Sequence, residues 1–344
     1  MQHRITEPGN LLKEDGSLAQ RGYSTRAVLT YNREQIKAPP WKIKEWDFYQ
    51  VSNDEYCVQL TIGHVSYAGE VSLRFFEFGS GYRVDFSRML ILPFNRLNMP
   101  RSAEVGDLAY RSGTVEMAFE VFEGGRRLTA RTPATRTAPP MEVDIRLHQP
   151  DPASIVMATP FDEDGRFFYY NHKINCMPAT GFVRVGEREY RFRPENAFGL
   201  LDWGRGVWPY RHEWFWGNGS GYVGGKRFGF NIGYGFGNTS AATENILFYD
   251  GTAHKLSHVY FDLPGTGGLH GPENFHERRR AVRDGVHADL RPVHGNETAV
   301  RGHPLPPAVR QMERQSGARR RDGAGDSGFD GLRGACGEPL VRRR

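Results

Sequence analysis

The sequence predicts an all-β, antiparallel protein folded as barrels or sandwiches. Along residues 23–263, short runs of alternating apolar and polar residues recur, and each run ends at Gly, Asn or Asp. The runs are rich in Val, Phe, Tyr and Ile, and turns such as EGG, VGE and YDG are typical of hairpins. No helical periodicity extends beyond about three turns.

The expected strands follow one another along the chain. In order they lie in residues 55–69, 70–78, 82–94, 114–125, 141–149, 180–194, 222–237 and 245–263. The first three runs read EYCVQLTIGHVSYAG, EVSLRFFEF and YRVDFSRMLILPF, and their period of two places apolar side chains on one face. The fourth run ends at EGG and the fifth, MEVDIRLHQ, keeps the same alternation. The last three contain the glycine turns VGE, VGG and YDG, so each is expected to fold back on itself.

The totals are those of a globular protein. The 344 residues are 38% hydrophobic and 12% aromatic, which suffices for one large or two ordinary domains. The N-terminus lacks the apolar run of a signal peptide, and no segment approaches the roughly 18 apolar residues of a membrane helix. A cytoplasmic protein without an integral membrane segment is expected. Cys57, Cys176 and Cys336 are far apart in sequence and are expected to be free thiols.

The net charge of +5 comes from the C-terminal part of the chain. Of the 45 basic and 40 acidic residues, 15 Arg and 10 acidic residues lie in 266–344, so the remainder is neutral. This part has no Tyr, Trp or Lys and cannot bury enough apolar surface to offset the entropy of ordering. One interpretation is a disordered Arg-rich arm that binds phosphates. The preferred hypothesis is an out-of-frame translation, and no nucleic-acid partner is expected.

Four segments are therefore predicted. They are an N-terminal extension (1–22), a first β domain (23–150), a second β domain (151–264) that is expected to be incomplete, and a disordered or frameshifted tail (265–344). A weak echo between Glu45-Trp46-Asp47-Phe48 and Glu213-Trp214-Phe215-Trp216 suggests duplication, with chance similarity as the alternative.

Four of the six tryptophans are crowded into LLDWGRGVWPYRHEWFW, residues 200–216. Asp202 and Arg205 are three positions apart around a glycine, where a tight turn would allow a bidentate ion pair. One interpretation is a packing plug at the closed end of a barrel. The other is a ligand cavity with tryptophan walls and a few oriented polar groups.

Two further stretches are expected to converge on this cluster. FFYYNHKINCMPATG supplies polar residues beside aromatic ones, and FNIGYGFGNTSAATEN supplies Asn and Glu beside small residues. The predicted ligand-binding residues are Trp203, Arg205, Trp208, Tyr210, His212, Trp214, Trp216, Asn231, Asn245, Tyr170, Asn171 and Lys173. A GxGxxG spacing at Gly219, Gly221 and Gly224 precedes a strand instead of a helix, so it predicts a hairpin and no dinucleotide loop. No metal site and no cofactor are expected.

Several long motifs carry a family resemblance. ITEPGNLL, EWDFY, ATPF, FYYNHKINCMPATG, LLDWGRGVWPYRHEWFW, FGFNIGYGFGNTSAATEN and LFYDGTAHKL resemble the bacterial family called Domain of Unknown Function 2804. More distantly, this family resembles the paired lipocalin-like barrels of hydroxyneurosporene synthase and tocopherol cyclase. The resemblance implies two lipocalin-like antiparallel units and proton-driven hydration or cyclisation of isoprenoids.

The leading hypothesis is binding of a hydrophobic small molecule, with acid-catalysed isomerisation, hydration or cyclisation. Asp202, or alternatively Glu213 or Glu244, would donate the proton, because a carboxyl walled by tryptophan is desolvated. The alternative is a non-enzymatic lipid carrier or structural protein in which the Trp/Asp/Arg cluster is a packing plug. The sequence leaves open whether the protein is an enzyme, what its ligand is and what its oligomeric state is.

Overall fold

The computed structural model describes residues 2–209 and 214–262, together with the backbone of residues 286–290 and 298–302. Strands dominate this part of the chain, and its helical turns are two 3-10 segments, η1 (Arg33–Gln35) and η2 (Pro40–Lys42). The predicted all-β fold class is confirmed. Among the described ladders, the short pair β1 (Gly9–Asn10) and β3 (Leu29–Thr30) is parallel and the others are antiparallel.

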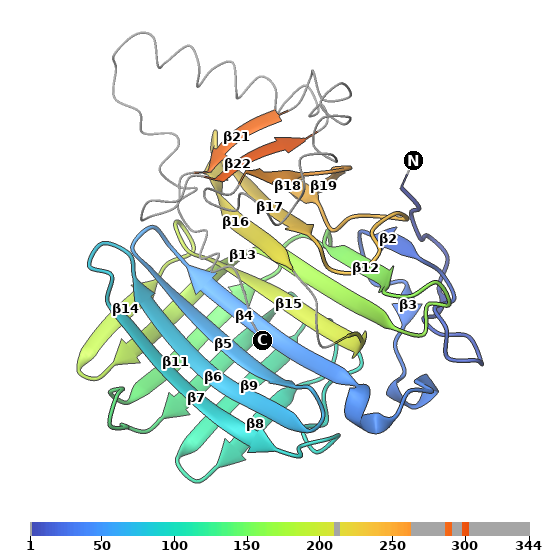
Figure 1. The fold of residues 1–344 in the computed structure, drawn as a ribbon. Helices are drawn as coiled ribbons and strands as arrows, with labels where there is room; N and C mark the ends of the chain where they lie inside the picture. Colours follow the sequence, from blue (N-terminus) through green and yellow to red (C-terminus); the bar gives the residue numbers. More distant parts are fainter. Residues whose placement is uncertain (1, 210–213, 263–285, 291–297, 303–344) are drawn as a thin grey trace.

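A curled sheet of 13 strands forms the lower layer of the molecule (Figure 1). Its main path runs β7-β6-β5-β4-β15-β13-β11-β10-β9-β8, with β12, β2 and β14 attached beside this path. The strands are β2 (Gly22–Ser24), β4 (Lys44–Ser52), β5 (Tyr56–His64), β6 (Ala68–Glu77), β7 (Arg83–Ile91), β8 (Leu108–Ser112), β9 (Val115–Phe122), β10 (Gly125–Thr132), β11 (Met141–His148), β12 (Ile155–Pro160), β13 (Phe168–Val185), β14 (Arg188–Phe192) and β15 (Phe198–Val207).

The curl brings the two ends of this sheet toward each other. In Figure 1 the blue strands β4–β7 lie in front of the green strands β8–β11. A hydrogen bond from Arg88 Nη1 to the Ser112 carbonyl, 3.4 Å long, joins the edge strands β7 and β8. The main hydrophobic core fills the space between the two walls, with Val58, Leu73, Ile145 and other side chains fully buried. The sheet is thus a half-barrel whose interior is filled mainly by apolar side chains.

Strand β13 is the long strand that connects the walls to the upper part of the molecule. Its first half pairs with β12 and β15, and its second half pairs with β11 and β14. The register with β15 shifts between Ile174 and Met177, and Cys176 in this bulge has a φ of 58°. A bulge bends a strand and increases its twist, which lets one strand belong to two differently oriented parts of the sheet.

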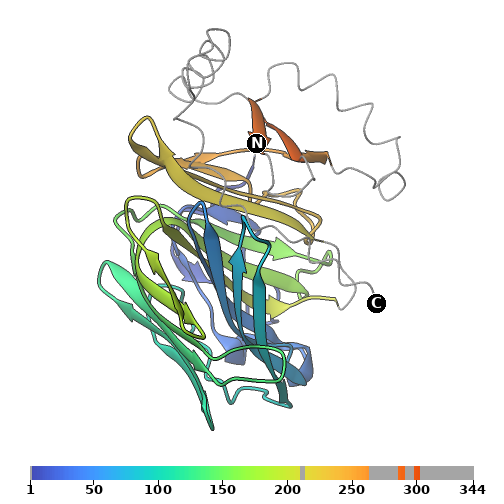
Figure 2. The same cartoon turned by 90° about the vertical axis from the view of Figure 1, so that its left-hand side faces the viewer.

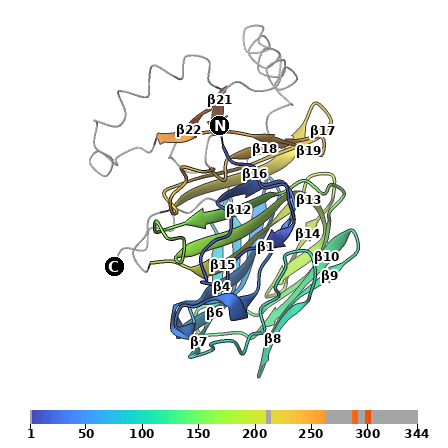
Figure 3. The ribbon, with the colours of Figure 1, turned by 90° about the vertical axis from the view of Figure 1, so that its right-hand side faces the viewer.

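A second sheet of four strands lies across the top of the curled sheet (Figures 2 and 3). Its order is β16-β17-β18-β19, and the strands are β16 (Phe215–Val223), β17 (Lys226–Tyr234), β18 (Ile246–Tyr249) and β19 (Thr252–Lys255). Gly224 and Gly225 both have positive φ and form the turn of the β16–β17 hairpin, so the hairpin predicted at GNGSGYVGG is confirmed.

The two layers approach each other closely over the bulge of β13. A Cβ atom added to Gly229 of β17 would lie 2.3 Å from Sγ of Cys176. Asn175 Nδ2 donates a hydrogen bond of 3.3 Å to the Phe230 carbonyl, and the Cys176 amide donates one of 3.2 Å to Ser220 Oγ. Cys57 and Cys176 are both buried and neither belongs to a disulfide, which agrees with the prediction for the thiols, and Cys336 lies outside the described residues.

The curled sheet crosses the predicted boundary between residues 150 and 151, because β15 pairs with β4 along its whole length. The predicted division into domains at residues 23–150 and 151–264 remains a prediction, and the two segments share this sheet. Within the predicted tail, the backbone of β21 (Val286–Leu290) and β22 (Thr298–Gly302) forms a small sheet with β20 (Tyr260–Asp262). The remaining tail residues lie outside the described part. The described residues contain no helix with the length and apolarity needed to cross a membrane.

Candidate functional site

Strands β13 and β15 present two different faces, because successive side chains of a strand point in opposite directions. Asn171 and Lys173 of β13 and Asp202 of β15 lie on the face toward the upper sheet, where they contact one another. Tyr170 and Trp203 lie on the other face and belong to the core of the curled sheet. The predicted site residues are thus divided between the layers.

Lys173 is the central charge between the two layers. Its side chain is fully buried, and its Nζ lies 2.8 Å from Oδ2 of Asp202 and 3.6 Å from Oε2 of Glu244. The same Nζ lies 4.3 Å from the ring centroid of Trp216 and 4.6 Å from that of Trp214. The side chain of Lys173 is therefore shared by two carboxylates and two indole faces.

Asp202 is enclosed by hydrogen-bond donors. Asn171 Nδ2 donates to its Oδ1 over 2.7 Å, and the Tyr169 hydroxyl donates to the same oxygen over 3.3 Å. Burial and the nearby carboxylates of Asp202 and Glu244 raise the pKa of Tyr169 well above its ordinary value, so its hydroxyl keeps its proton. Lys173 lies against the second oxygen, Oδ2, so both oxygens of Asp202 have partners.

Glu244 reaches the network from the segment between β17 and β18. Trp214 Nε1 donates to its Oε1 over 2.9 Å, and Asn231 Nδ2 donates to its Oε2 over 3.1 Å. The side chain crosses Gly233, where an added Cβ would lie 1.9 Å from Oε1. Glycine at this position is what leaves room for the carboxylate.

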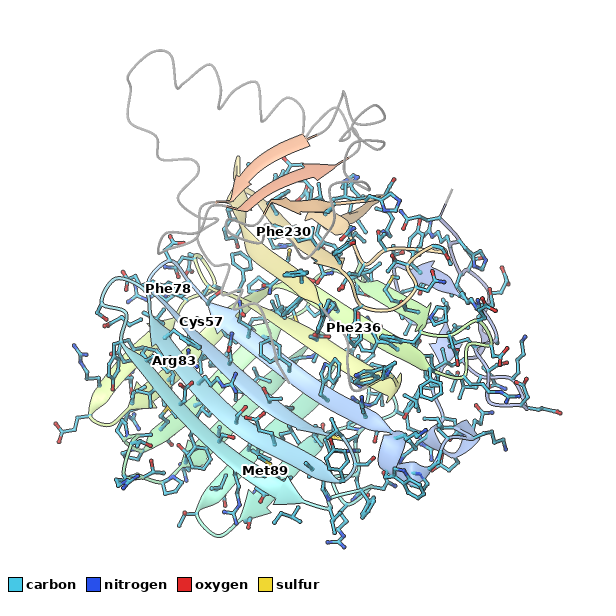
Figure 4. All side chains as sticks on the ribbon, viewed as in Figure 1. Cys57, Phe78, Arg83, Met89, Phe230 and Phe236 are labelled. Atoms are coloured by element: carbon cyan, nitrogen blue, oxygen red, sulfur yellow. The ribbon has the colours of Figure 1, made fainter. Side chains whose placement is uncertain are left out.

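Aromatic rings surround the polar groups. Tyr169, Trp208 and Phe236 form a buried cluster, against which Trp46 and Trp214 pack. The ring of Phe236 lies 4.7 Å from Tyr169 and 5.0 Å from Trp214 between centroids. Figure 4 labels Phe236, which lies just beyond the end of β17 at the seam between the two layers. These buried rings form an apolar wall, and electrostatic interactions are stronger in such surroundings than in bulk water.

A small cavity opens at this seam, with a volume of about 10 Å³, which is room for about one water molecule. It is lined by Met157, Thr159, Tyr169, Asn171, Gly233, Tyr234, Phe236, Thr239 and Glu244. Glu244 keeps 11% of its side chain exposed, whereas Asp202 keeps 4%. Of the two carboxylates, Glu244 is the one that borders the cavity.

The opposite face of β15 carries a second charged cluster, inside the curled sheet. The Arg205 guanidinium lies 4.2 Å from the Trp203 ring centroid, and its Nη2 donates to Asp47 Oδ1 over 2.8 Å. Its other donors reach the carbonyls of Trp46, Pro100 and Gly204. Burial raises the pKa of Asp47, and the adjacent Arg205 opposes this shift. The expected Asp202–Arg205 pair is wrong, because residues 198–207 form an extended strand that separates the two side chains onto different faces.

Other predicted residues have structural contacts. Tyr170 donates a hydrogen bond of 2.8 Å to the Leu29 carbonyl inside the curled sheet. Asn245 Oδ1 accepts from the Gly233 amide over 2.8 Å, and Asn231 Oδ1 accepts from Trp216 Nε1 over 2.7 Å, so both residues join strands of the upper sheet. Tyr210, His212 and Glu213 lie outside the described residues.

The predicted site omitted Tyr169, Trp46 and Phe236, all of which border the network. Tyr169 shares the two-residue period of Asn171 and Lys173, and this signal could have selected it in place of Tyr170. Trp46 is placed by the long-range pairing of β4 with β15, at a position where an added Cβ on Gly204 would meet its ring at 2.5 Å. Within the part of the chain that the structure describes, no three His, Cys, Asp or Glu side chains group as metal ligands.

The family model described as Domain of unknown function (DUF2804) matches residues 2–298, which extends past the start of the predicted tail. No curated protein matches the chain. Kievitone hydratase from Nectria haematococca is similar in structure, with a TM-score of 0.43 and 8% identity over 75% of this chain and 76% of its own. CghA with Sch210972 is similar with a TM-score of 0.43 and 11% identity over 71% of this chain and 68% of its own.

Proposed function

The chain belongs to the DUF2804 family, and we propose that it binds a small hydrophobic molecule between its two layers and transfers a proton to it. One observation carries this proposal: a buried lysine and two carboxylates are enclosed by aromatic side chains, and one of the carboxylates borders a cavity. Apolar walls with a few oriented polar groups are typical of small-molecule sites.

Glu244 is the proposed proton donor. In its protonated form it would transfer the proton to one carbon of a ligand C=C bond, whose π electrons form the new C–H bond and leave a cation on the other carbon. Water would then add to the cation and return a proton to the Glu244 carboxylate, which gives net hydration. Loss of a proton from a neighbouring carbon would instead give isomerisation, or cyclisation if a second double bond attacks first. The faces of Trp214 and Phe236 would stabilise the cation.

Asp202 takes a positioning role in this proposal. It forms an ion pair with Lys173, accepts hydrogen bonds from Asn171 and Tyr169, and does not line the cavity. Asp202 holds the ammonium of Lys173 in place, and Lys173, whose Nζ is 3.6 Å from Oε2 of Glu244, would attract the Glu244 carboxylate after the proton has left. The assignment of Glu244 ahead of Asp202 rests on this difference in access.

Trp203 and Arg205 are proposed to be structural. Both are buried inside the curled sheet, and the guanidinium of Arg205 is saturated by Asp47 and three carbonyls. For Trp203 and Arg205 we therefore favour the first interpretation of the tryptophan-rich stretch, that of a packing plug. The functional interpretation applies to the residues on the other face of the same strand.

A non-enzymatic role is the second candidate, because the cavity holds only about one water molecule. A ligand would require movement of side chains such as Phe236 and Tyr234. If they do not move, the network between the layers is packing alone.

Native mass spectrometry and solvent extraction of the purified protein distinguish the two candidates. We expect a co-purifying apolar molecule, and we expect Phe236→Ala to change its occupancy while Met89→Ala, at an exposed position of the edge strand β7 that lines neither cavity, does not. A protein free of any such molecule, with both variants altered only in melting temperature, would support the packing role instead.

A further inference from the structure

The curled sheet contains a second, larger cavity, away from the proposed site. It has a volume of about 510 Å³ and lies where the β9–β10 turn and the segment after β11 approach β17. Its lining includes Glu104, Val105, Phe122, Glu123, Arg126 and Asp151. This volume is within the roughly 300–1,000 Å³ of small-molecule pockets.

Arg126 is the buried cation of this cavity. It is 1% exposed, and no carboxylate of the described residues lies within ion-pair distance of it. Its Nη2 donates to neutral acceptors, the Ala103 carbonyl over 3.0 Å and Gln149 Oε1 over 3.2 Å, and its Nη1 contacts Met177 Sδ at 3.7 Å. Its Nε has no hydrogen-bond partner in the described part of the chain.

Arg205 is a second buried arginine with which Arg126 can be compared. It is equally buried in the same sheet, but it has the Asp47 carboxylate at 2.8 Å. A buried cation without a counter-ion costs free energy that an anionic partner recovers. Because Arg126 lines a cavity and Arg205 is enclosed, the partner of Arg126 can come from solution.

We propose that this cavity binds a monocarboxylic acid with an apolar body, its carboxylate paired with Arg126. A planar carboxylate accepts two hydrogen bonds from a guanidinium, and Nε is available for one of them. The body of the ligand lies against Val105 and Phe122, which are 71% and 41% exposed without a ligand.

The other charges of the cavity favour a single negative charge on the ligand. Asp151 is already paired with Arg227 at 2.8 Å, and Glu123 is exposed at the rim. Glu104 is also at the rim, where partial burial raises the pKa of its carboxyl and the charge of Arg126 opposes this shift without a direct ion pair. Exposed carboxylates repel a multiply charged phosphate more than a monocarboxylate.

Titration calorimetry with 2-naphthoate tests the proposal, and the neutral 2-naphthamide is the matched probe. We expect the wild-type protein to bind naphthoate at one site and at least about tenfold more tightly than naphthamide, since a charge-assisted pair is worth about 1.4 kcal/mol or more. Arg126→Met should lose this preference, and its melting temperature should not fall. Arg127→Met is the control variant, because Arg127 is the next residue on β10 and pairs outward with Asp144.

Equal affinity of the wild-type protein for the two probes, or no binding of naphthoate at millimolar concentration, overturns the proposal, and neither result depends on a variant that folds. Unchanged naphthoate binding by Arg126→Met also overturns it. Glu244→Gln should bind naphthoate like the wild-type protein, so failure here and failure of the proposed function are separate results.

Discussion

Lys173 connects the chemistry of the candidate site to the stability of the protein. It lies between Asp202 and Glu244, and it has no exposed surface of its own. The sequence predicts that Lys173, Asn171 and Glu244 converge on the tryptophan-rich stretch, because polar residues beside many aromatics need partners. In the structure Lys173 and Glu244 contact Trp214, and Asn171 donates a hydrogen bond to Asp202. The sequence does not indicate which of these side chains contact one another, because the partners come from different strands.

Replacement of Lys173 by Met is expected to lower the free energy of unfolding by about 3–5 kcal/mol, because it leaves two carboxylates without their buried cation. The double variant Lys173→Met, Asp202→Asn should recover part of this loss. Urea unfolding measures both. Lys226→Met is the control, because Lys226 forms an exposed pair with Asp250 and should change stability by less than about 1 kcal/mol. A Lys173→Met effect as small as that of the control would contradict the pairing.

The buried His172 is expected to make the free energy of unfolding depend on pH. It is buried beside Ser154, and burial lowers its pKa from 6.5 to about 3. Because the folded pKa is the lower one, the contribution of this group is fully present above pH 6.5 and is lost as the pH falls toward 3. Between pH 6.5 and 4.5, the wild-type protein should lose up to about 1.4 kcal/mol per pH unit more than His172→Gln. Denaturant titrations at several pH values measure this, and parallel curves for the two proteins would refute it.

At the scale of elements, the sequence predicted hairpins well and the two central strands poorly. The runs at 55–69, 70–78 and 82–94 correspond to β5, β6 and β7, because alternation and glycine turns are local signals. The run at 180–194 covers the second half of β13 together with β14, whereas the first half of β13 and the whole of β15 were not predicted as strands. Both of their faces are buried, one against the core and one against the upper sheet, so polar and aromatic residues occur without an exposed face to set the period.

Gly233 of the upper sheet allows a test of the role of Glu244. Gly233→Ala should displace Glu244, since the new Cβ would overlap its carboxylate. We expect the variant to keep most of its stability and to lose nearly all proton transfer to the ligand, at least about 100-fold, which is the usual contribution of a positioned general acid. Gly217→Ala is the control, because a Cβ there meets Ile232 at an ordinary distance of 3.4 Å. Equal activity of the two variants, measured by ligand turnover, would show that Glu244 does not act.

At the scale of the whole molecule, the candidate site exists only where the two layers meet. Lys173 and Asp202 come from the curled sheet, and Glu244 and Trp214 come from the upper part. The sequence predicted that the tryptophan-rich stretch would be buried. The division of its residues between two faces depends on the register of β15 with β4 and β13, which no local pattern encodes.

The shared sheet predicts cooperative unfolding. Because β15 from the second half of the chain pairs with β4 from the first half, residues 23–150 and 151–264 cannot separate without breaking this ladder. Tryptophan fluorescence, which reports on the seam between the layers, and far-ultraviolet circular dichroism, which reports on all strands, should give one coincident urea transition. Two transitions with different midpoints would show that the halves unfold independently.

The most direct test of the central claim is deuterium incorporation into the bound molecule. The co-purified ligand is incubated with the wild-type protein and with Glu244→Gln in deuterated water, and its mass is then followed. The account predicts that carbon-bound deuterium accumulates with the wild-type protein and is reduced at least about 100-fold in the variant. Incorporation at the same rate in both proteins, or in neither, would contradict proton transfer by Glu244.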